Sequence, residues 1–133
     1  FCFWPGARYQ QKHELIFIAR RKGAVLISNT PSNQSTIFEI DRQMKNDIHP
    51  TQKPIKLFED LLLFHSNRND IVYEPFCGSG TTLIACEKNN RKCLAIEISP
   101  LFCQVIIDRW EKFTNKKASK LNGKSRKASK IHA

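Results

Sequence analysis

The apolar residues of this chain fall into short runs and helical spacings that predict alternating strands and helices. The predicted elements are strands at 15–19 and 24–28, a polar connector at 29–47, a helix at 55–65, a strand at 71–75, a helix at 81–89, a strand at 93–98 and a helix at 100–113. Ser99 as N-cap and Pro100 as first helical residue mark the start of the last helix. The order from residue 55 onward is typical of a parallel sheet and predicts an α/β fold.

A glycine-containing segment connects the predicted strand at 71–75, which is expected to be buried, to the helix at 81–89. Gly78 and Gly80 allow the backbone to approach a ligand where a Cβ would block it, and the following helix points free N–H groups at the same place. Glu74 and Glu97 stand near the ends of two successive strands, close to the offset of about 20 residues at which an acid meets a ribose. Together these features predict a pocket for an adenosine-bearing ligand.

The same segment disfavours two common kinds of nucleotide site. Leu83 stands where the dinucleotide fingerprint places its third glycine, which argues against an NAD or FAD site and against a nucleotide-dependent oxidoreductase. No Gly-Lys-Ser or Gly-Lys-Thr follows, which argues against a phosphate-binding P-loop. What remains is a glycine loop for a ligand without phosphates, or simply a tight strand-to-helix turn in an ordinary α/β protein.

Two separate segments resemble parts of the DNA amino-methyltransferases. The sequence Glu-Pro-Phe-Cys-Gly-Ser-Gly-Thr-Thr at 74–82 resembles their S-adenosylmethionine-binding loop, which usually reads Asp-Pro-Phe-x-Gly-Ser-Gly-Thr-Thr. The sequence His-Pro-Thr-Gln-Lys-Pro at 49–54 is similar to a second family segment, and residues 11–17 resemble more weakly a strand that precedes target recognition. The order is that of members whose catalytic region comes first. The resemblance implies a Rossmann-like S-adenosylmethionine-dependent methyltransferase fold, here a C-terminal portion of a parallel sheet flanked by helices.

The resemblance also implies which residues bind the cofactor, S-adenosyl-L-methionine. In the family, the first acid lies near the methionine part and the second bonds the ribose hydroxyls, which carries over to Glu74 and Glu97. Position 74 holds Glu where Asp is commoner, which adds a methylene to the side chain. The implied cofactor-binding residues are Thr51, Gln52, Lys53, Glu74, Pro75, Phe76, Cys77, Gly78, Ser79, Gly80, Thr81, Thr82, Glu97 and Ile98.

Some of these residues have a plainer structural interpretation. Phe76 and Ile98 stand beside the two acids and are expected to form apolar walls for the adenine, with core packing as the alternative. Thr51, Gln52 and Lys53 are expected to approach the cofactor from the other side, but Thr51 or Gln52 would also cap a helix that has Pro54 in its first turn.

The family's catalytic motif, Asp-Pro-Pro-Tyr or a near variant, is absent from the 133 residues, because none of the six prolines is adjacent to another. No catalytic residue is therefore assigned, and this chain alone is expected to be inactive. The expected organisation is the end of a catalytic and target-recognition region at 1–48, a cofactor-binding region at 49–115 and a basic tail at 116–133. We expect the motif upstream of residue 1, in a longer enzyme of which this is the C-terminal part; a natural half-enzyme with a partner chain is the alternative.

The charge of the chain points to a polyanionic partner. The net charge is +10 and the isoelectric point is about 9.6, which suits the double-stranded DNA that such a family modifies. Much of the excess lies at 116–130, where small and polar spacers between basic residues predict disorder. Such a tail is expected either to contact phosphates in a salt-dependent way or only to keep the chain soluble.

The five cysteines and four histidines do not form a metal-ligand pattern, so no metal site is predicted. The cysteines are expected to be reduced and mostly buried, as in a cytoplasmic protein. A nucleophilic role for Cys77 is disfavoured, because enzymes that methylate carbon 5 of cytosine carry a Pro-Cys pair that this chain lacks. The sequence has neither a signal peptide nor an apolar run of about 20 residues that would span a membrane.

The expected function is therefore site-specific DNA methylation in the cytoplasm of a bacterial or phage-infected cell. A methyl group would pass directly from S-adenosylmethionine to the N6 amine of a flipped adenine. Cytosine N4 is the alternative target, because enzymes for both bases share the glycine loop and differ mainly in the missing motif. A non-catalytic DNA-binding relic or a partner subunit of such an enzyme also accounts for the charge and the missing motif. Neither the recognition sequence nor the oligomeric state is indicated.

Overall fold

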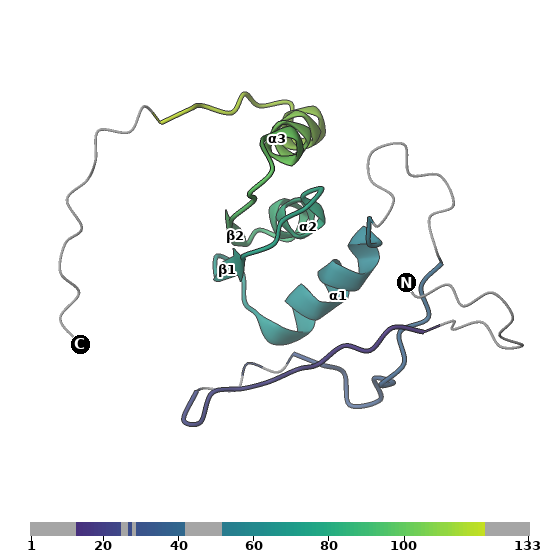
Figure 1. The fold of residues 1–133 in the computed structure, drawn as a ribbon. Helices are drawn as coiled ribbons and strands as arrows, with labels where there is room; N and C mark the ends of the chain where they lie inside the picture. The colour runs from purple at the N-terminus through teal and green to yellow at the C-terminus, as the bar shows by residue number, and fades with distance from the viewer. Residues whose placement is uncertain (1–12, 25–26, 28, 42–51, 122–133) are drawn as a thin grey trace, which may run out of the picture.

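The computed structural model describes residues 13–24, 27, 29–41 and 52–121 (Figure 1). Its helices and strands, in chain order, are α1 (Ile55–His65), β1 (Ile71–Glu74), α2 (Thr81–Lys88), β2 (Lys92–Ala95) and α3 (Pro100–Thr114). The predicted order from residue 55 onward is confirmed. The largest difference in bounds is at β2, which ends at Ala95 rather than at 98.

The two strands form a parallel sheet, and α2 is the crossover between them. Ile71 pairs with Lys92 and Glu74 with Ala95. The ladder runs beyond the strand ends, because the Ile96 amide donates to the Glu74 carbonyl at 2.9 Å and the Cys77 amide donates to the Ile96 carbonyl at 3.0 Å. The residues that follow β1 therefore remain hydrogen-bonded to those that follow β2.

The core lies where α1 and β2 meet α2. Leu62, Ala85 and Cys86 are buried and in mutual contact, and Ala85 is fully inaccessible to solvent. The half-buried hydrophobic residues that pack against this cluster are Ile55, Phe58, Val72 and Cys93. Figure 1 shows α2 between α1 and α3, with the two strands to one side of this row, beside α2. Small side chains at 85 and 86 allow the close approach that this central position of α2 requires.

Only one face of the sheet is covered within the described residues, so the prediction of a buried strand at 71–75 is wrong. Val72 faces the helices, whereas Ile71 and Tyr73 are 65% and 64% exposed. Leu94, the cross-strand neighbour of Tyr73, is 57% exposed as well. Successive side chains of a strand point to opposite faces, so covering one face leaves every second apolar residue open.

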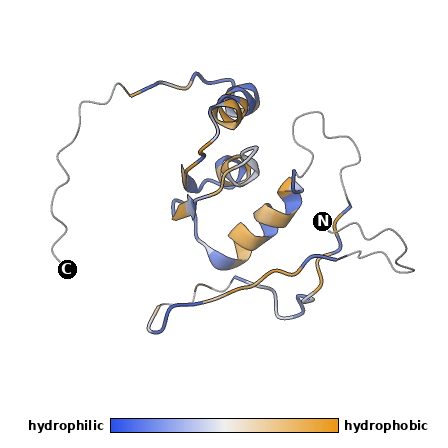
Figure 2. Cartoon of the chain, viewed as in Figure 1, coloured by the Kyte–Doolittle hydropathy of each residue, from blue (hydrophilic) through white to orange (hydrophobic). Residues whose placement is uncertain are grey.

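The predicted strand at 15–19 does not form. Residues 13–24 follow an irregular path, and Leu15 and Phe17 are 75% and 90% exposed. Figure 2 shows this segment as an apolar stretch that lies outside any sheet. A strand requires a hydrogen-bonded neighbour, and the described residues supply none for this segment. The predicted strand at 24–28 lies mainly outside the described residues.

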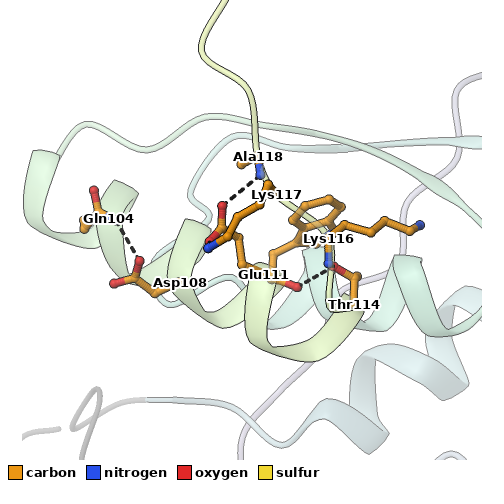
Figure 3. Close-up of polar contacts among 8 residues, drawn as sticks. Gln104, Asp108, Glu111, Thr114, Lys116, Lys117 and Ala118 are labelled. Carbon is orange, nitrogen blue, oxygen red and sulfur yellow. Dashed lines mark hydrogen bonds and ion pairs between the residues drawn. The ribbon is translucent and has the colours of Figure 1, made fainter.

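The chain turns sharply where α3 ends (Figure 3). Asn115 adopts a left-handed conformation with φ of 56°, and its amide donates to the Glu111 carbonyl at 2.8 Å. The Glu111 carboxylate accepts from the Lys117 ammonium at 2.7 Å and from the Ala118 amide at 2.8 Å. Residues 116–121 form no regular element. The remainder of the predicted disordered tail, 122–133, lies outside the described residues.

Candidate cofactor site

The parallel register places the two predicted acids at one edge of the sheet. Glu74 is the last residue of β1, and Glu97 follows the end of β2 by two residues. In open α/β sheets the carboxyl ends of parallel strands are where ligands bind. The glycine loop, residues 75–80, leaves β1 at this same edge and leads directly into α2.

Glu74 fixes both ends of the glycine loop. One carboxylate oxygen accepts from the Phe76 amide at 3.0 Å, and the other accepts from the Thr82 hydroxyl at 2.8 Å. Thr82 belongs to the first turn of α2 and is 7% exposed. Hydrogen bonds to a carboxylate are stronger than those between neutral groups, so Glu74 stabilises the curvature of the loop.

Glu97 joins the glycine loop to the start of α3. Its carboxylate accepts from the Gly78 amide at 2.8 Å and from the Ser99 amide at 2.9 Å. Ser99 is the N-cap of α3 and Pro100 its first residue, as predicted, although the Ser99 side chain makes no capping bond. The structure therefore brings Glu74, Gly78, Thr82 and Glu97 together in one hydrogen-bonded unit.

The two glycines of the loop serve different purposes. Both have positive φ, 53° at Gly78 and 80° at Gly80, a conformation that strains residues with a Cβ. A Cβ at Gly80 would lie 3.2 Å from Cγ1 of Ile106, so the packing of α3 accounts for that glycine. A Cβ at Gly78 would meet only the Phe76 carbonyl oxygen, at 4.0 Å. Of the two glycines, Gly78 alone adjoins open space that a ligand can fill.

Arg109 of α3 hydrogen-bonds to residues where the glycine loop meets α2, a role that was not predicted from the sequence. Its Nη1 donates to the Ser79 carbonyl at 2.8 Å and lies 3.4 Å from the hydroxyl oxygens of Ser79 and Thr81. Ser79 and Thr81 are each 6% exposed. Burial lowers the pKa of Arg109 from its ordinary value. The only sequence signal was its spacing, one helical turn after Ile106 on the same face of the helix.

The two predicted apolar walls are not part of the core. Phe76 is 88% exposed and Ile98 is 95% exposed, so core packing does not account for them within the described residues. Each follows one of the acids closely, Phe76 two residues after Glu74 and Ile98 next to Glu97, and Pro75 is half-buried. Their contact with an adenine remains a prediction.

Residues 52–54, the described part of the His-Pro-Thr-Gln-Lys-Pro segment, form no hydrogen bond or ion pair with the glycine loop. Lys53 forms an ion pair with Glu14, and none of its described polar contacts reaches the loop. Gln52 does not cap α1, because the N-cap is Pro54 and no side chain bonds to the first turn. Thr51 lies outside the described residues. The predicted roles of these three residues toward a cofactor stay predictions.

The cysteine in the loop is poorly suited to nucleophilic chemistry. Cys77 is 7% exposed, and burial raises the pKa of its thiol to about 11, so the thiol is protonated near neutral pH. Cys86 and Cys93 share a hydrogen bond that raises the pKa of Cys93 and lowers that of Cys86. Across the part of the chain that the structure describes, no three His, Cys, Asp or Glu side chains form a metal-binding group. No helix among the described residues is long and apolar enough to cross a membrane.

Comparisons with known proteins agree with this geometry. Over 65 residues the chain is 45% identical to the orphan methyltransferase M.BamHII of Bacillus amyloliquefaciens, a match that covers 49% of this chain and 24% of that protein. It is 37% identical over 73 residues to the DNA adenine methyltransferase YhdJ of Escherichia coli, covering 55% of this chain and 25% of that protein. The chain thus spans about a quarter of the length of these relatives.

A solved structure and a family model extend the comparison. The structure of the M1.HpyAVI complex with S-adenosylmethionine superposes with a TM-score of 0.59 at 35% identity, and it covers 68% of this chain and 46% of that one. The family model described as DNA methylase, which comprises the N6-adenine and N4-cytosine enzymes, matches residues 3–108. The chain therefore belongs to this family of S-adenosylmethionine-dependent DNA amino-methyltransferases.

Proposed function

We propose that this chain forms the S-adenosylmethionine-binding part of a DNA methyltransferase that modifies adenine at N6. The observation that carries the proposal is the arrangement of Glu74 and Glu97, which lie at the carboxyl edge of the parallel strands and hold the glycine loop between them. Among the relatives, M.BamHII is named an orphan methyltransferase and YhdJ a DNA adenine methyltransferase, which supports the proposal.

The residues at this edge suit an adenosine. The family resemblance assigns Glu97 to the ribose, whose hydroxyl groups can donate hydrogen bonds to a carboxylate. The exposed Phe76 and Ile98 offer apolar surface for the adenine ring. Gly78, with open space where a Cβ would stand, lets the backbone approach the ligand. Glu74 is assigned to the methionine end because its carboxylate lies between the loop and the first turn of α2.

The contribution of this chain to the reaction is positioning. S-adenosylmethionine supplies an activated methyl group on its sulfonium, and the protein places that group in line with an acceptor amine. Glu74 and Glu97 hold the loop that orients the donor. The Asp-Pro-Pro-Tyr-type motif that accepts the amine is absent from residues 1–133, so this chain alone is proposed to bind the donor without transferring its methyl group.

DNA is the proposed substrate, and the basic tail is proposed to add phosphate contacts. The range 116–130 holds seven of the 22 Lys and Arg residues and none of the 12 acidic ones. Each phosphate neutralised on a duplex steepens the dependence of log affinity on log salt by about 0.9. Replacing these seven residues with serine is expected to flatten that slope in duplex binding measured by fluorescence anisotropy. An unchanged slope would leave the tail with a solubilising role only.

Calorimetric titration with S-adenosylhomocysteine, the demethylated product, tests cofactor binding. Glu97→Gln removes the charge but keeps the size of the side chain, so weaker binding would report the carboxylate rather than a cavity. Asp60→Asn is the matched control, because Asp60 pairs with Lys56 within α1 and lies outside the site. We expect binding by the wild type and by Asp60→Asn, and a loss of at least about tenfold in Glu97→Gln. A folded wild type without affinity would contradict the proposal.

The target base needs a separate experiment, because the described loop is shared by adenine and cytosine enzymes. DNA methylated by the enzyme together with its catalytic motif would be hydrolysed to nucleosides and examined by mass spectrometry. N6-methyl-2′-deoxyadenosine would support the proposal, and N4-methyl-2′-deoxycytidine would replace it with the alternative. The first residue of that catalytic motif gives an independent indication, since Asn or Asp there favours adenine and Ser favours cytosine.

A further inference from the structure

Helix α3 contacts the glycine loop through Ile106 and Arg109, which we call the loop clamp. The clamp residues are three positions apart, so both side chains project from one face of the helix. Ile106 fills the space where Gly80 lacks a side chain, and Arg109 reaches the Ser79 carbonyl and the hydroxyl of Thr81. The clamp contacts the loop at 79–81, whereas Glu97 bonds to the Gly78 amide.

The polar half of the clamp is a single nitrogen of the Arg109 guanidinium. Nη1 of Arg109 has three oxygen atoms of Ser79 and Thr81 within 3.4 Å, the nearest being a backbone carbonyl at 2.8 Å. A cationic donor makes a stronger hydrogen bond than a neutral one, and a partly buried site screens it less than water does. Lysine carries the same charge but not the rigid planar arrangement of donors.

Both the clamp and Glu97 connect the glycine loop to α3. The Glu97 carboxylate accepts from the Ser99 amide at the N-cap of α3, while Arg109 lies further along the same helix. A shift of α3 would therefore move both the Gly78 amide, through Glu97, and the Ser79 carbonyl, through Arg109. The contacts of Glu97 and Arg109 together therefore determine where the backbone at Gly78, with the open space beside it, is placed.

From this geometry we infer that Arg109 is a positioning residue for the cofactor loop, which acts through Ser79 and Thr81 and does not touch the ligand. The inference rests on the proposed function, because it assigns a purpose to the loop that Arg109 holds. Without the guanidinium, the loop remains connected to β1 and α2 but samples a wider range of positions. Binding of the donor then has to restrict that range, which weakens its affinity.

The test compares Arg109→Ala and Arg109→Lys with Lys112→Ala, an exposed position on the same helix. S-adenosylhomocysteine affinity is measured by calorimetry, and amide hydrogen exchange is measured for residues 77–82. We expect about tenfold weaker binding in Arg109→Ala, smaller weakening in Arg109→Lys and no change in Lys112→Ala. Exchange is expected to rise in the loop and to stay unchanged in α1 and β1. Added guanidinium ion, too dilute to unfold the chain, is expected to recover part of the affinity in Arg109→Ala.

The two readouts separate failure of this inference from failure of the proposed function. Unchanged affinity and unchanged loop exchange in Arg109→Ala would overturn the inference while leaving cofactor binding intact. If the wild type binds no ligand, the proposed function fails, and exchange alone then decides whether Arg109 holds the loop. Faster exchange throughout the chain in both Arg109 variants would show a general structural role and would also overturn the inference.

Discussion

The two faces of the β1/β2 sheet carry similar residues but are covered very differently. On the helix side, Val72 and Cys93 pack against the buried cluster that includes Leu62. On the other side, Tyr73 and Leu94 are each more than half exposed. Apolar residues alone therefore do not tell which face contributes to stability; the elements that cover a face decide it. Substitutions on the covered face are therefore expected to lower the free energy of unfolding more than substitutions on the open face.

The largest effect is expected at the centre of the covered side. Leu62→Ala should lower the free energy of unfolding by about 2 to 5 kcal/mol, because it removes a buried side chain and leaves a cavity. Leu63→Ala is the matched control, since Leu63 is the next residue of α1 and is 43% exposed. Urea unfolding followed by circular dichroism would measure both. Equal losses in the two variants would contradict the assignment of the core.

Alanine substitutions at the two loop glycines should differ in their effect on stability, because only the one at Gly80 would contact Ile106. Alanine at Gly78 or Gly80 costs about 1 to 2 kcal/mol of backbone strain, because both have positive φ. Gly80→Ala adds an overlap with Ile106 and should be the more destabilising change in urea unfolding. Combining it with Ile106→Ala should remove the added cost. Gly78→Ala should instead have the larger effect on S-adenosylhomocysteine affinity. The reverse ranking for affinity would show that Gly80 faces the ligand.

A smaller effect is expected from the buried Cys77 thiol. Its pKa is raised from 9.0 to about 11, so the folded state holds the proton more tightly than the unfolded state. The stability from this group is therefore fully present below pH 9 and is lost as the pH rises from 9 to 11. The difference in unfolding free energy between wild type and Cys77→Ala should be constant below pH 9 and change above it. A constant difference up to pH 11 would contradict the raised pKa.

Local signals explain what could be predicted from the sequence. Pro100 after Ser99 and the glycines before Thr81 mark helix starts within a few residues, so helix bounds were predicted closely. Long-range contacts could not be predicted in this way. Arg109 meets Ser79 from 30 residues away, and nothing near it in the sequence distinguishes it from an ordinary helical arginine.

The failed predictions have the same physical origin. The segment at 15–19 has strand-forming residues, but a strand exists only where another strand bonds to it, and the described residues offer none. The exposure of Tyr73 likewise depends on what covers the sheet rather than on the residue itself. The positions of Glu74 and Glu97 were predictable because both follow directly from a parallel βαβ connection.

The smallest effect is expected on the open face of the sheet. Tyr73→Thr keeps a residue that favours strands and should change the free energy of unfolding by no more than about 0.5 kcal/mol. Val72→Thr is the matched substitution on the covered face, where Val72 is half-buried against the core and a hydroxyl without a partner should cost about 1 to 3 kcal/mol. Both are measured by urea unfolding at several protein concentrations. A large loss in Tyr73→Thr that depends on concentration would mean that a second copy covers the open face. The contrast between the two faces would then belong to the isolated chain and not to the protein in solution.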